Sequence, residues 1–159
     1  MAKCVVQEAQ ESDAVRLAPK LRWADKREIV AHSGLSPDHG LMRCYESSDK
    51  VWAVYCDDEP IALFGYLKLD DNSANVWLLG SDKILDVRWW WLRESKKWLK
   101  VVAQDFDRLW AVADVRNKIH TRWFKWLGFE VLSTLITGPY NLPFYHIEYN
   151  NKEQLCATS

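Results

Sequence analysis

The hydrophobic pattern of this chain changes period at Gly80, and this change restricts the folds that the chain can adopt. Before Gly80, three runs rich in Trp, Val, Tyr, Phe and Leu, at residues 51–56, 61–69 and 74–79, are separated by short polar turns. Such runs are typical of strands, and the short turns predict an antiparallel meander. After Gly80, apolar residues recur about every four positions as far as Val102, which predicts a long amphipathic helix.

A second strand and a second helix follow this long helix. The run RLWAVA at residues 108–113 has the length and composition of a strand, and residues 117–127 form an amphipathic pattern that ends at Gly128. Because a strand, a helix and a strand follow one another, residues 74–79 and 108–113 are expected to pair in parallel through a right-handed crossover. The last two strands are expected at residues 131–136 and 144–149.

The N-terminal part of the chain predicts one strand and two helical pieces. Residues 5–9 have a short β-branched pattern that suits a strand. Apolar positions then recur at helical spacing over residues 14–33, but Pro19 interrupts this run and divides the helix. The turn-forming residues 35–40, LSPDHG, predict a loop that closes the helical region.

Length and composition predict a single domain. With 159 residues, of which 48% are hydrophobic, the chain can bury a continuous core. We therefore expect one mixed α/β domain over residues 1–150, followed by a polar C-terminal tail at residues 151–159.

Charge and hydropathy argue against two classes of partner. The 21 Lys and Arg residues are balanced by 22 Asp and Glu residues, whereas a protein that coats nucleic acid usually has a basic excess. No apolar run approaches the roughly 18 to 20 residues that span a bilayer, and the first residues lack the apolar segment of a signal peptide. We therefore expect a cytoplasmic protein that binds neither a membrane nor nucleic acid.

The four cysteines are far apart in the sequence. They form no C-x-x-C pair and no spacing with histidine that is typical of a metal site, which excludes a zinc knuckle and a thioredoxin-like redox motif. Free thiols that act as small hydrophobic residues are expected at Cys4, Cys44, Cys56 and Cys156.

Tryptophan is unusually frequent, with ten residues, of which Trp89, Trp90 and Trp91 are consecutive. Neighbouring residues on a helix point about 100° apart, so at least one of these three rings must be exposed. Exposed indoles are common at the centres of protein interfaces, and they could support a homodimer or the docking of another protein. The alternative is that tryptophan fills a bulky core.

The predicted order of elements, β-α-α-β-β-β-α-β-α-β-β, resembles that of the GCN5-related N-acetyltransferases (GNAT). The similarity is strongest at residues 115–129, VRNKIHTRWFKWLGF, which resemble the family's strand end, Asn, helix and closing Gly-Phe pair. A narrower resemblance to GNAT-like proteins of short-tailed lytic bacteriophages rests on other segments. These segments are LAP at 17–19, LR at 21–22, Asp25, PIALFG at 60–65, LGSD at 79–82 and RES at 93–95.

The resemblance implies that acetyl-CoA binds where the two parallel strands separate. Its pantetheine arm would pair with the end of the strand at residues 74–79, and its pyrophosphate would meet the start of the long helix, where unpaired N–H groups favour anions. The residues expected to contact the cofactor are Leu78, Leu79, Gly80, Ser81, Lys83, Asn117 and Phe124. For Asn117, the alternative role is to cap the helix that follows it.

Two features depart from the family pattern. The family's phosphate-binding loop is rich in glycine, whereas this chain has a single glycine followed by Asp82 and Asp86. Their carboxylates repel a pyrophosphate unless Lys83 or Arg88 offsets them. In addition, the Tyr that protonates the departing thiolate in many GNAT enzymes is replaced by Phe124, which has no proton to give.

Two residues near the expected cleft are candidates for the catalytic base. Asp114 ends a strand and could accept a proton from an amine, and its alternative role is that of a turn or cap residue. His120 lies on the following helix, and a pKa near 6.5 suits a base. Its alternative role is that of a partly exposed structural histidine. No pattern among the other histidines indicates a metal site.

The resemblance implies an acetyl-CoA-dependent N-acetyltransferase of phage origin that acts on an amine which the sequence does not identify. Because of the two departures, the alternative is a non-catalytic GNAT-fold phage protein that acts in virion morphogenesis or binds a host protein. Either protein would work in the cytoplasm of the host cell, and the second could also be packaged in the virion.

Overall fold

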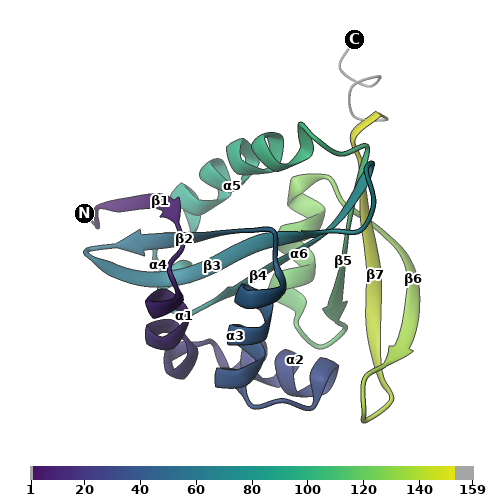
Figure 1. Cartoon of the computed structure of the whole chain (residues 1–159), viewed down its shortest axis with the longest axis horizontal. Coiled ribbons are helices and arrows are strands. Elements are labelled where there is room, and N and C mark those ends of the chain that lie inside the picture. The colour runs from purple at the N-terminus through teal and green to yellow at the C-terminus, as the bar shows by residue number, and fades with distance from the viewer. Residues whose placement is uncertain (1, 153–159) are drawn as a thin grey trace.

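The computed structural model describes residues 2–152, which form one mixed sheet with helices on both faces (Figure 1). The strands are β1 (Cys4–Glu8), β2 (Lys50–Cys56), β3 (Glu59–Lys68), β4 (Ser73–Gly80), β5 (Arg108–Asp114), β6 (Glu130–Thr137) and β7 (Leu142–Asn150). The helices are α1 (Glu11–Leu17), the short 3-10 helix η1 (Ala18–Lys20), α2 (Trp23–Ser33), α3 (Pro37–Ser47), α4 (Lys83–Asp86), α5 (Arg88–Ala103) and α6 (Lys118–Leu127). Across the sheet the strand order is β1-β2-β3-β4-β5-β7-β6.

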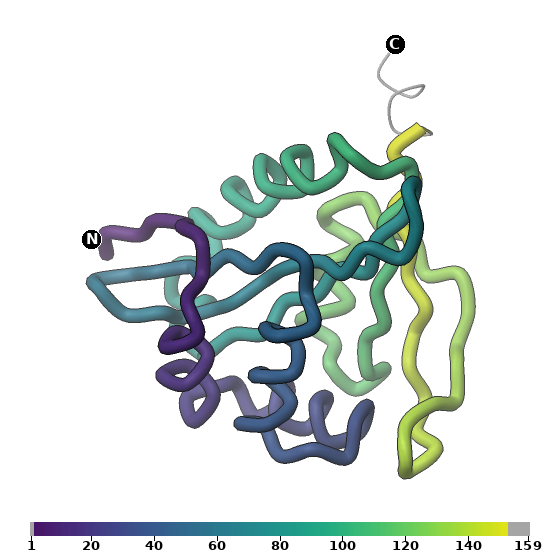
Figure 2. Tube along the Cα trace, viewed as in Figure 1, coloured from purple at the N-terminus to yellow at the C-terminus, as the bar shows by residue number. Residues whose placement is uncertain are grey.

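The sheet is antiparallel except at one place. Strands β2, β3 and β4 form the predicted antiparallel meander, and β7 pairs antiparallel with both β5 and β6. Among the strands of residues 2–152, only β4 and β5 run parallel, as the sequence predicted, and α4 and α5 connect them. Figure 2 shows the β2–β3 hairpin and the β6–β7 hairpin at opposite sides of the molecule.

Successive residues of β3 pack into two separate cores. Leu63 is buried with Leu17 of α1 and Leu41 of α3 on one face of the sheet. Phe64 points to the other face and packs against Trp91 of α5, with ring centroids 5.6 Å apart. Because successive strand residues face opposite sides, this run of apolar residues covers both faces of the central sheet.

The prediction of a loop at residues 35–40 is wrong, because α3 begins inside this segment. Ser36 occupies the N-cap position, and its hydroxyl accepts a hydrogen bond from the backbone N–H of His39 at 3.3 Å. Pro37 is the first helical residue, where the N–H that it lacks would have had no partner within the helix. Helix α3 is therefore an element that the sequence did not predict.

The two other helical regions are divided. The run at residues 14–33 is interrupted at Pro19, as predicted, so that α1, η1 and α2 follow one another. The helix α2 ends at Gly34, which has a φ of 73°, a conformation that favours glycine. The long helix expected after Gly80 is interrupted at Val87, which separates α4 from α5.

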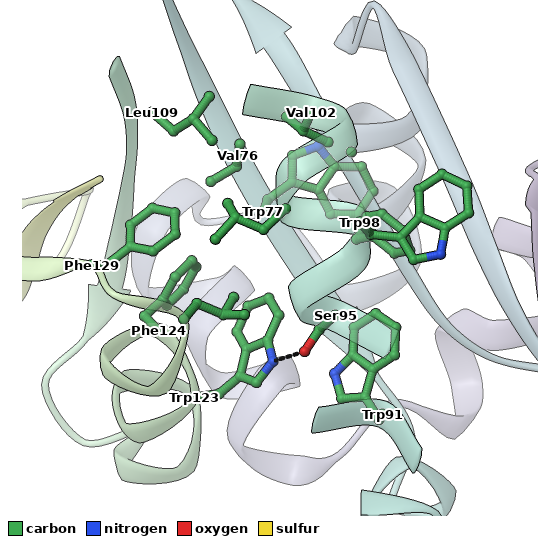
Figure 3. Close-up of a pocket in the computed structure, with 14 residues that line it drawn as sticks. Val76, Trp77, Trp91, Ser95, Trp98, Val102, Leu109, Trp123, Phe124 and Phe129 are labelled. Atoms are coloured by element: carbon green, nitrogen blue, oxygen red, sulfur yellow. Dashed lines mark hydrogen bonds between the residues drawn. The ribbon is translucent and has the colours of Figure 1, made fainter. Parts of the chain in front are cut away.

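The consecutive tryptophans point in different directions, as predicted. Trp89 is 67% exposed, whereas Trp91 is only 5% exposed. Trp91 stacks on Trp123 of α6 with ring centroids 6.1 Å apart, and Trp123 Nε1 donates to Ser95 Oγ at 3.2 Å. Figure 3 shows these side chains around a small cavity of about 50 Å³ between α5, α6 and the sheet. Tryptophan therefore fills much of this core, and Trp89 remains at the surface.

Two of the four cysteines form a disulfide, which corrects the prediction of free thiols. Cys4 of β1 and Cys56 of β2 are direct partners in the antiparallel ladder, with Cα atoms 4.1 Å apart. They are 52 residues apart in the sequence, so only the register of the sheet brings them together. Cys44 is a free thiol, as predicted, and Cys156 lies outside the described residues.

The end of the described chain is held against α5. Asn151 Nδ2 donates to the backbone oxygens of Ala103 at 2.9 Å and Phe106 at 3.3 Å. The first residue of the predicted tail is therefore bound to the domain, whereas residues 153–159 of that tail lie outside the described part of the chain.

No helix within residues 2–152 combines the length and the apolar character needed to cross a membrane.

The disulfide predicts how many thiols react. In denaturant without reductant, the four cysteines minus the two in the bond should leave two reactive thiols per chain, against four after reduction. Reduction should also lower the free energy of unfolding by about 2 to 4 kcal/mol, because the bond restricts a long loop of the unfolded chain. Thiol titration and urea unfolding measure the two quantities. Four reactive thiols before reduction would contradict the bond.

Candidate active site

Strands β4 and β5 separate soon after they begin, as the sequence led us to expect. They pair only where Ser73–Asn75 lies opposite Arg108–Trp110, and β4 then continues to Gly80 without β5 beside it. The backbone of Gly80 faces this opening, because its N–H donates to a carboxylate of α2. Backbone groups alternate between the two edges of a strand, so the N–H and C=O of Leu78 face the same opening. The end of β4 therefore offers backbone groups that β5 does not occupy.

Two cavities lie beside this opening. One has a volume of about 520 Å³ and is lined by residues of α2, α3, β4 and β7, and we call it the α3 cavity. The other has a volume of about 690 Å³ and is lined by residues of α4, α5 and α6, and we call it the α5 cavity. The side chains of Leu78 and His120 line both cavities. These two residues therefore belong to a wall that the two cavities share.

Two carboxylates of α2 connect the separated strands. The N–H of Gly80, at the end of β4, donates to Asp25 Oδ2 at 2.9 Å. The N–H of Asp114, at the end of β5, donates to Glu28 Oε2 at 3.0 Å. Asp25 and Glu28 are three positions apart, so they lie on one face of the helix, and both are buried. Helix α2 thus connects the ends of β4 and β5, which are not paired with each other there.

Asn117 and Arg22 complete this group, and we call Arg22, Asp25, Glu28 and Asn117 the α2 network. Asn117 Nδ2 donates to Asp25 Oδ1 at 2.9 Å and to Glu28 Oε2 at 3.2 Å. Arg22 Nη2 donates to Asn117 Oδ1 at 3.1 Å and forms an ion pair with Asp25 Oδ1 at 2.8 Å. Buried charges are tolerated when they are paired and hydrogen-bonded, and the α2 network meets both conditions.

His120 is held by the same network. Its Nδ1 lies 3.2 Å from Glu28 Oε1, and since a carboxylate only accepts hydrogen bonds, Nδ1 carries the proton. In the neutral ring, Nε2 then has a free lone pair, and this buried atom has no hydrogen-bond partner among the described residues.

Glu28 also sets the basicity of His120. Burial alone lowers the pKa of the imidazole, but the charge and hydrogen bond of Glu28 raise it by more, so the pKa lies above its ordinary value. Nε2 is thus a basic ring nitrogen without a partner among the described residues, buried within a side chain that lines both cavities, and such an atom can accept a proton.

No family model and no curated protein matches the sequence. Solved structures, however, match nearly the whole chain. The aminoglycoside acetyltransferase AAC(6')-Ib, solved with ribostamycin and coenzyme A, has a TM-score of 0.73 at 13% identity and covers 99% of this chain and 98% of its own. The aminoglycoside N(6')acetyltransferase of Legionella pneumophila has a TM-score of 0.70 at 11% identity, with 100% and 98% covered. A GNAT-family acetyltransferase of Streptococcus pneumoniae has a TM-score of 0.64 at 12% identity, with 93% and 99% covered.

The chain has the GNAT fold. This finding confirms the predicted mixed α/β fold class and its order of elements, to which α3 is an addition. The narrower resemblance to phage proteins finds no support among these structures.

Four of the residues predicted to contact the cofactor line the cavities of this GNAT fold. Leu78 lines both cavities, and Gly80 lines the α5 cavity. Leu79 and Phe124 line the α3 cavity. Ser81 is buried next to them at the end of β4, and its hydroxyl has no partner among the described residues.

Lys83 is directed elsewhere. It forms an ion pair with Glu59, as does Lys20, and these two hydrogen bonds lower the pKa of Glu59 to about 2. Lys83 is not among the residues that line either of the two cavities. Its predicted contact with the cofactor therefore gains no support from the geometry.

Among the described residues, four cations line the α5 cavity. One is Arg22, which is paired with Asp25 in the same wall, and the other three are Arg88 at the start of α5 and Arg122 and Lys125 on α6. Asp82 and Asp86, which were expected to repel a pyrophosphate, do not line this cavity. The charged groups that face it are therefore mainly positive, which suits phosphate groups.

The carboxylate of Asp114 binds Arg116 and does not line either cavity. Arg116 Nη2 and Nε donate to its two oxygens at 2.7 Å and 2.9 Å. Burial raises the pKa of Asp114, but the hydrogen bonds of Arg116 outweigh it, and the pKa lies below its usual value. Such a carboxylate is a weak base. Of the two candidate bases, the fold therefore brings only His120 to the cavities.

Asn117 does not cap α6 through its side chain, which was one of the two roles considered for it. It occupies the N-cap position of α6, but its side chain makes no capping hydrogen bond. Both hydrogens of its amide are donated to Asp25 and Glu28 instead. Its contact with the cofactor stays a prediction.

Cys44 lines the α3 cavity but is not a nucleophile at neutral pH. Burial, together with the negative charge of Glu28, raises the pKa of its thiol to about 11. The thiol is therefore protonated, and a covalent acyl intermediate on Cys44 is disfavoured.

Sequence reasoning missed Asp25 and Glu28 as site residues. The signal that could have found them is the spacing of Arg22, Asp25 and Glu28, which places three charged residues on one face of a helix. Charged residues in this pattern usually form a solvated helix face. Only the packing of α2 against the ends of β4 and β5 shows that this face is buried.

The α2 network predicts a large loss of stability for Asp25→Ala. This change leaves the buried guanidinium of Arg22 without its carboxylate and removes the acceptor of the Gly80 N–H, so the free energy of unfolding should fall by about 3 to 5 kcal/mol. Urea unfolding at neutral pH measures the effect. The control is Asp71→Ala in an exposed turn, which should change it by less than about 0.5 kcal/mol. Equal losses in the two variants would contradict a stabilising role of the network.

Proposed function

We propose that this protein transfers an acetyl group from acetyl-CoA to an amine, with acetyl-CoA in the α5 cavity and the amine in the α3 cavity. The observation that carries this proposal is that the two cavities share His120 and Leu78 in their walls, beside the part of β4 that does not pair with β5. The GNAT fold supports the proposal, and so do the complexes of structural neighbours with coenzyme A.

The residues of the α5 cavity fit acetyl-CoA. Arg88, Arg122 and Lys125 would bind its phosphates, and the free backbone groups of Leu78 would pair with its pantetheine arm. Acetyl-CoA supplies an activated thioester, so the protein has only to position the amine and to move one proton.

His120 would carry that proton. Glu28 holds Nδ1 in its protonated form, so Nε2 accepts the proton that the amine loses when it becomes nucleophilic. Because the side chain also lines the α5 cavity, Nε2 can release the same proton on that side. A second acid is then not required, which accounts for Phe124 at the position where the family has a Tyr.

Phe124 would have a different task in this arrangement. Its ring lies 4.8 Å from the ring of His120, measured between centroids, and it is buried. It would keep the imidazole in place and exclude water from it.

The pKa of His120 predicts the pH dependence of the reaction. The base form exists above a pKa that lies higher than usual, so kcat/KM should rise with pH through this value. In Glu28→Gln the carboxylate that raises this pKa is absent, and the rising limb should move to lower pH. In His120→Gln the limb should disappear and kcat should fall by about 10² to 10⁴. Initial rates of thiol release from about pH 5 to about pH 9 give the pH profiles of the wild-type protein and of the two variants.

His146→Gln is the matched control for these variants. His146 also pairs with a glutamate, Glu148, at 3.1 Å, but it lies on β7 and lines neither cavity. Its loss should leave the pH profile unchanged. An unchanged limb in Glu28→Gln, or a normal rate in His120→Gln, would contradict the proposed roles.

Arg122→Glu should weaken the binding of coenzyme A. The change reverses one of the charges that line the α5 cavity, so the Kd measured by titration calorimetry should rise by about tenfold or more. Lys100→Glu reverses a charge on the exposed face of α5 and should leave the Kd within about twofold at moderate salt. An equal effect of both variants would show that only the overall charge matters.

The other expectations from the sequence remain predictions. They are an origin in a bacteriophage, a cytoplasmic location, a homodimer through exposed tryptophans, and the alternative of a non-catalytic protein of virion assembly or host-protein binding. No contact within residues 2–152 favours the non-catalytic alternative over the proposed activity.

A further inference from the structure

The charges around the α3 cavity limit which amine can be the acceptor, and this inference rests on the proposed function. Among the described residues that line the cavity, only Glu28 is acidic. Its carboxylate already accepts hydrogen bonds from the N–H of Asp114, from Asn117 Nδ2 and from His120 Nδ1. No lining carboxylate within residues 2–152 is therefore left to bind an additional ammonium group of a substrate.

Among the described residues, one cation lines the cavity. It is Arg43 of α3, an exposed residue whose guanidinium makes no hydrogen bond or ion pair with the described residues. Arginine is charged at all relevant pH values, and its planar group matches a carboxylate. The guanidinium therefore attracts an acidic group of a substrate and repels a substrate that carries several positive charges.

The remaining wall is mainly apolar. Ile29 of α2, Leu67 of β3, Trp77 of β4 and Phe144 of β7 all line the cavity. Polar residues also line it, namely His32, Ser33, Ser47, Ser48 and Asn75. A volume of about 520 Å³ and a mainly apolar wall are typical of a site for a small molecule.

We propose that the acceptor is a small amino carboxylic acid with an apolar side chain. Its amine reaches His120, its apolar part packs against the wall, and its carboxylate binds Arg43. In the reaction the amine attacks the thioester, a carbon–nitrogen bond forms, the carbon–sulfur bond breaks, and the amine proton passes through His120 Nε2 to the departing thiolate, which becomes the thiol. Polyamines and aminoglycosides are excluded as preferred acceptors, although the neighbours include a protein solved with ribostamycin and a spermidine N-acetyltransferase chimera.

The first experiment compares acceptors with the wild-type protein. Thiol release from acetyl-CoA is measured with the twenty standard amino acids, with phenethylamine as the analogue of phenylalanine without its carboxylate, and with spermidine and kanamycin. We expect the highest kcat/KM for an apolar amino acid and at least a tenfold lower value for its analogue without the carboxylate. A preference for spermidine or kanamycin overturns the inference but leaves the proposed function intact.

The second experiment tests Arg43 directly. In Arg43→Glu, kcat/KM for the preferred amino acid should fall at least tenfold, whereas kcat/KM for the analogue without a carboxylate should be unchanged or higher. Lys100→Glu, with the same change of charge on the exposed face of α5, should leave the ratio of the two values unchanged. An equal loss with both acceptors in Arg43→Glu contradicts binding of a carboxylate at this residue.

Failure of this inference and failure of the proposed function give different results. If calorimetry shows no binding of acetyl-CoA to the wild-type protein, the proposed function fails, and the inference fails with it. If acetyl-CoA binds but none of the twenty amino acids is acetylated, the inference alone is overturned.

Discussion

Strand β4 leaves β5 after three paired residues, and the hydrogen bonds that the sheet loses there have to be made by another part of the chain. Helix α2 makes two of them, because Asp25 accepts from Gly80 and Glu28 accepts from Asp114. Buried backbone N–H groups without partners are costly, so these carboxylates allow the strands to stay apart. The opening in the sheet, the two cavities beside it and the orientation of His120 all depend on this one set of contacts.

The same contacts give the two carboxylates different tasks. Asp25 is neutralised by Arg22 and fixes the end of β4, whereas Glu28 contacts His120 and raises its pKa. Arg88, Arg122 and Lys125 line the α5 cavity in addition to the paired Arg22, and Arg43, which has no ion pair with the described residues, lines the α3 cavity. Under the proposed function, each cavity would attract a negative group and the ring of His120 would carry the proton.

Regular patterns in the sequence predicted most of the fold. The change of period at Gly80 correctly indicated the meander, the crossover and the parallel pair. The helix α3 was missed because Ser36 and Pro37 are typical of turns as well as of helix starts. The disulfide and the role of Glu28 were missed for another reason, since both depend on residues that are far apart in the sequence and meet only in the folded sheet.

The carboxylates of α2 bind the ends of β4 and β5, and one of them also contacts His120. These two roles have a consequence for the evolution of such a protein. If a descendant lost its chemistry, selection for a folded chain would still preserve Asp25 and Glu28, since they replace the missing strand partner. Their presence in a relative would therefore reveal nothing about whether that relative is an active enzyme. The guanidinium of Arg43 makes no hydrogen bond or ion pair with the described residues, so its retention in a relative would be a more informative sign of the proposed substrate binding.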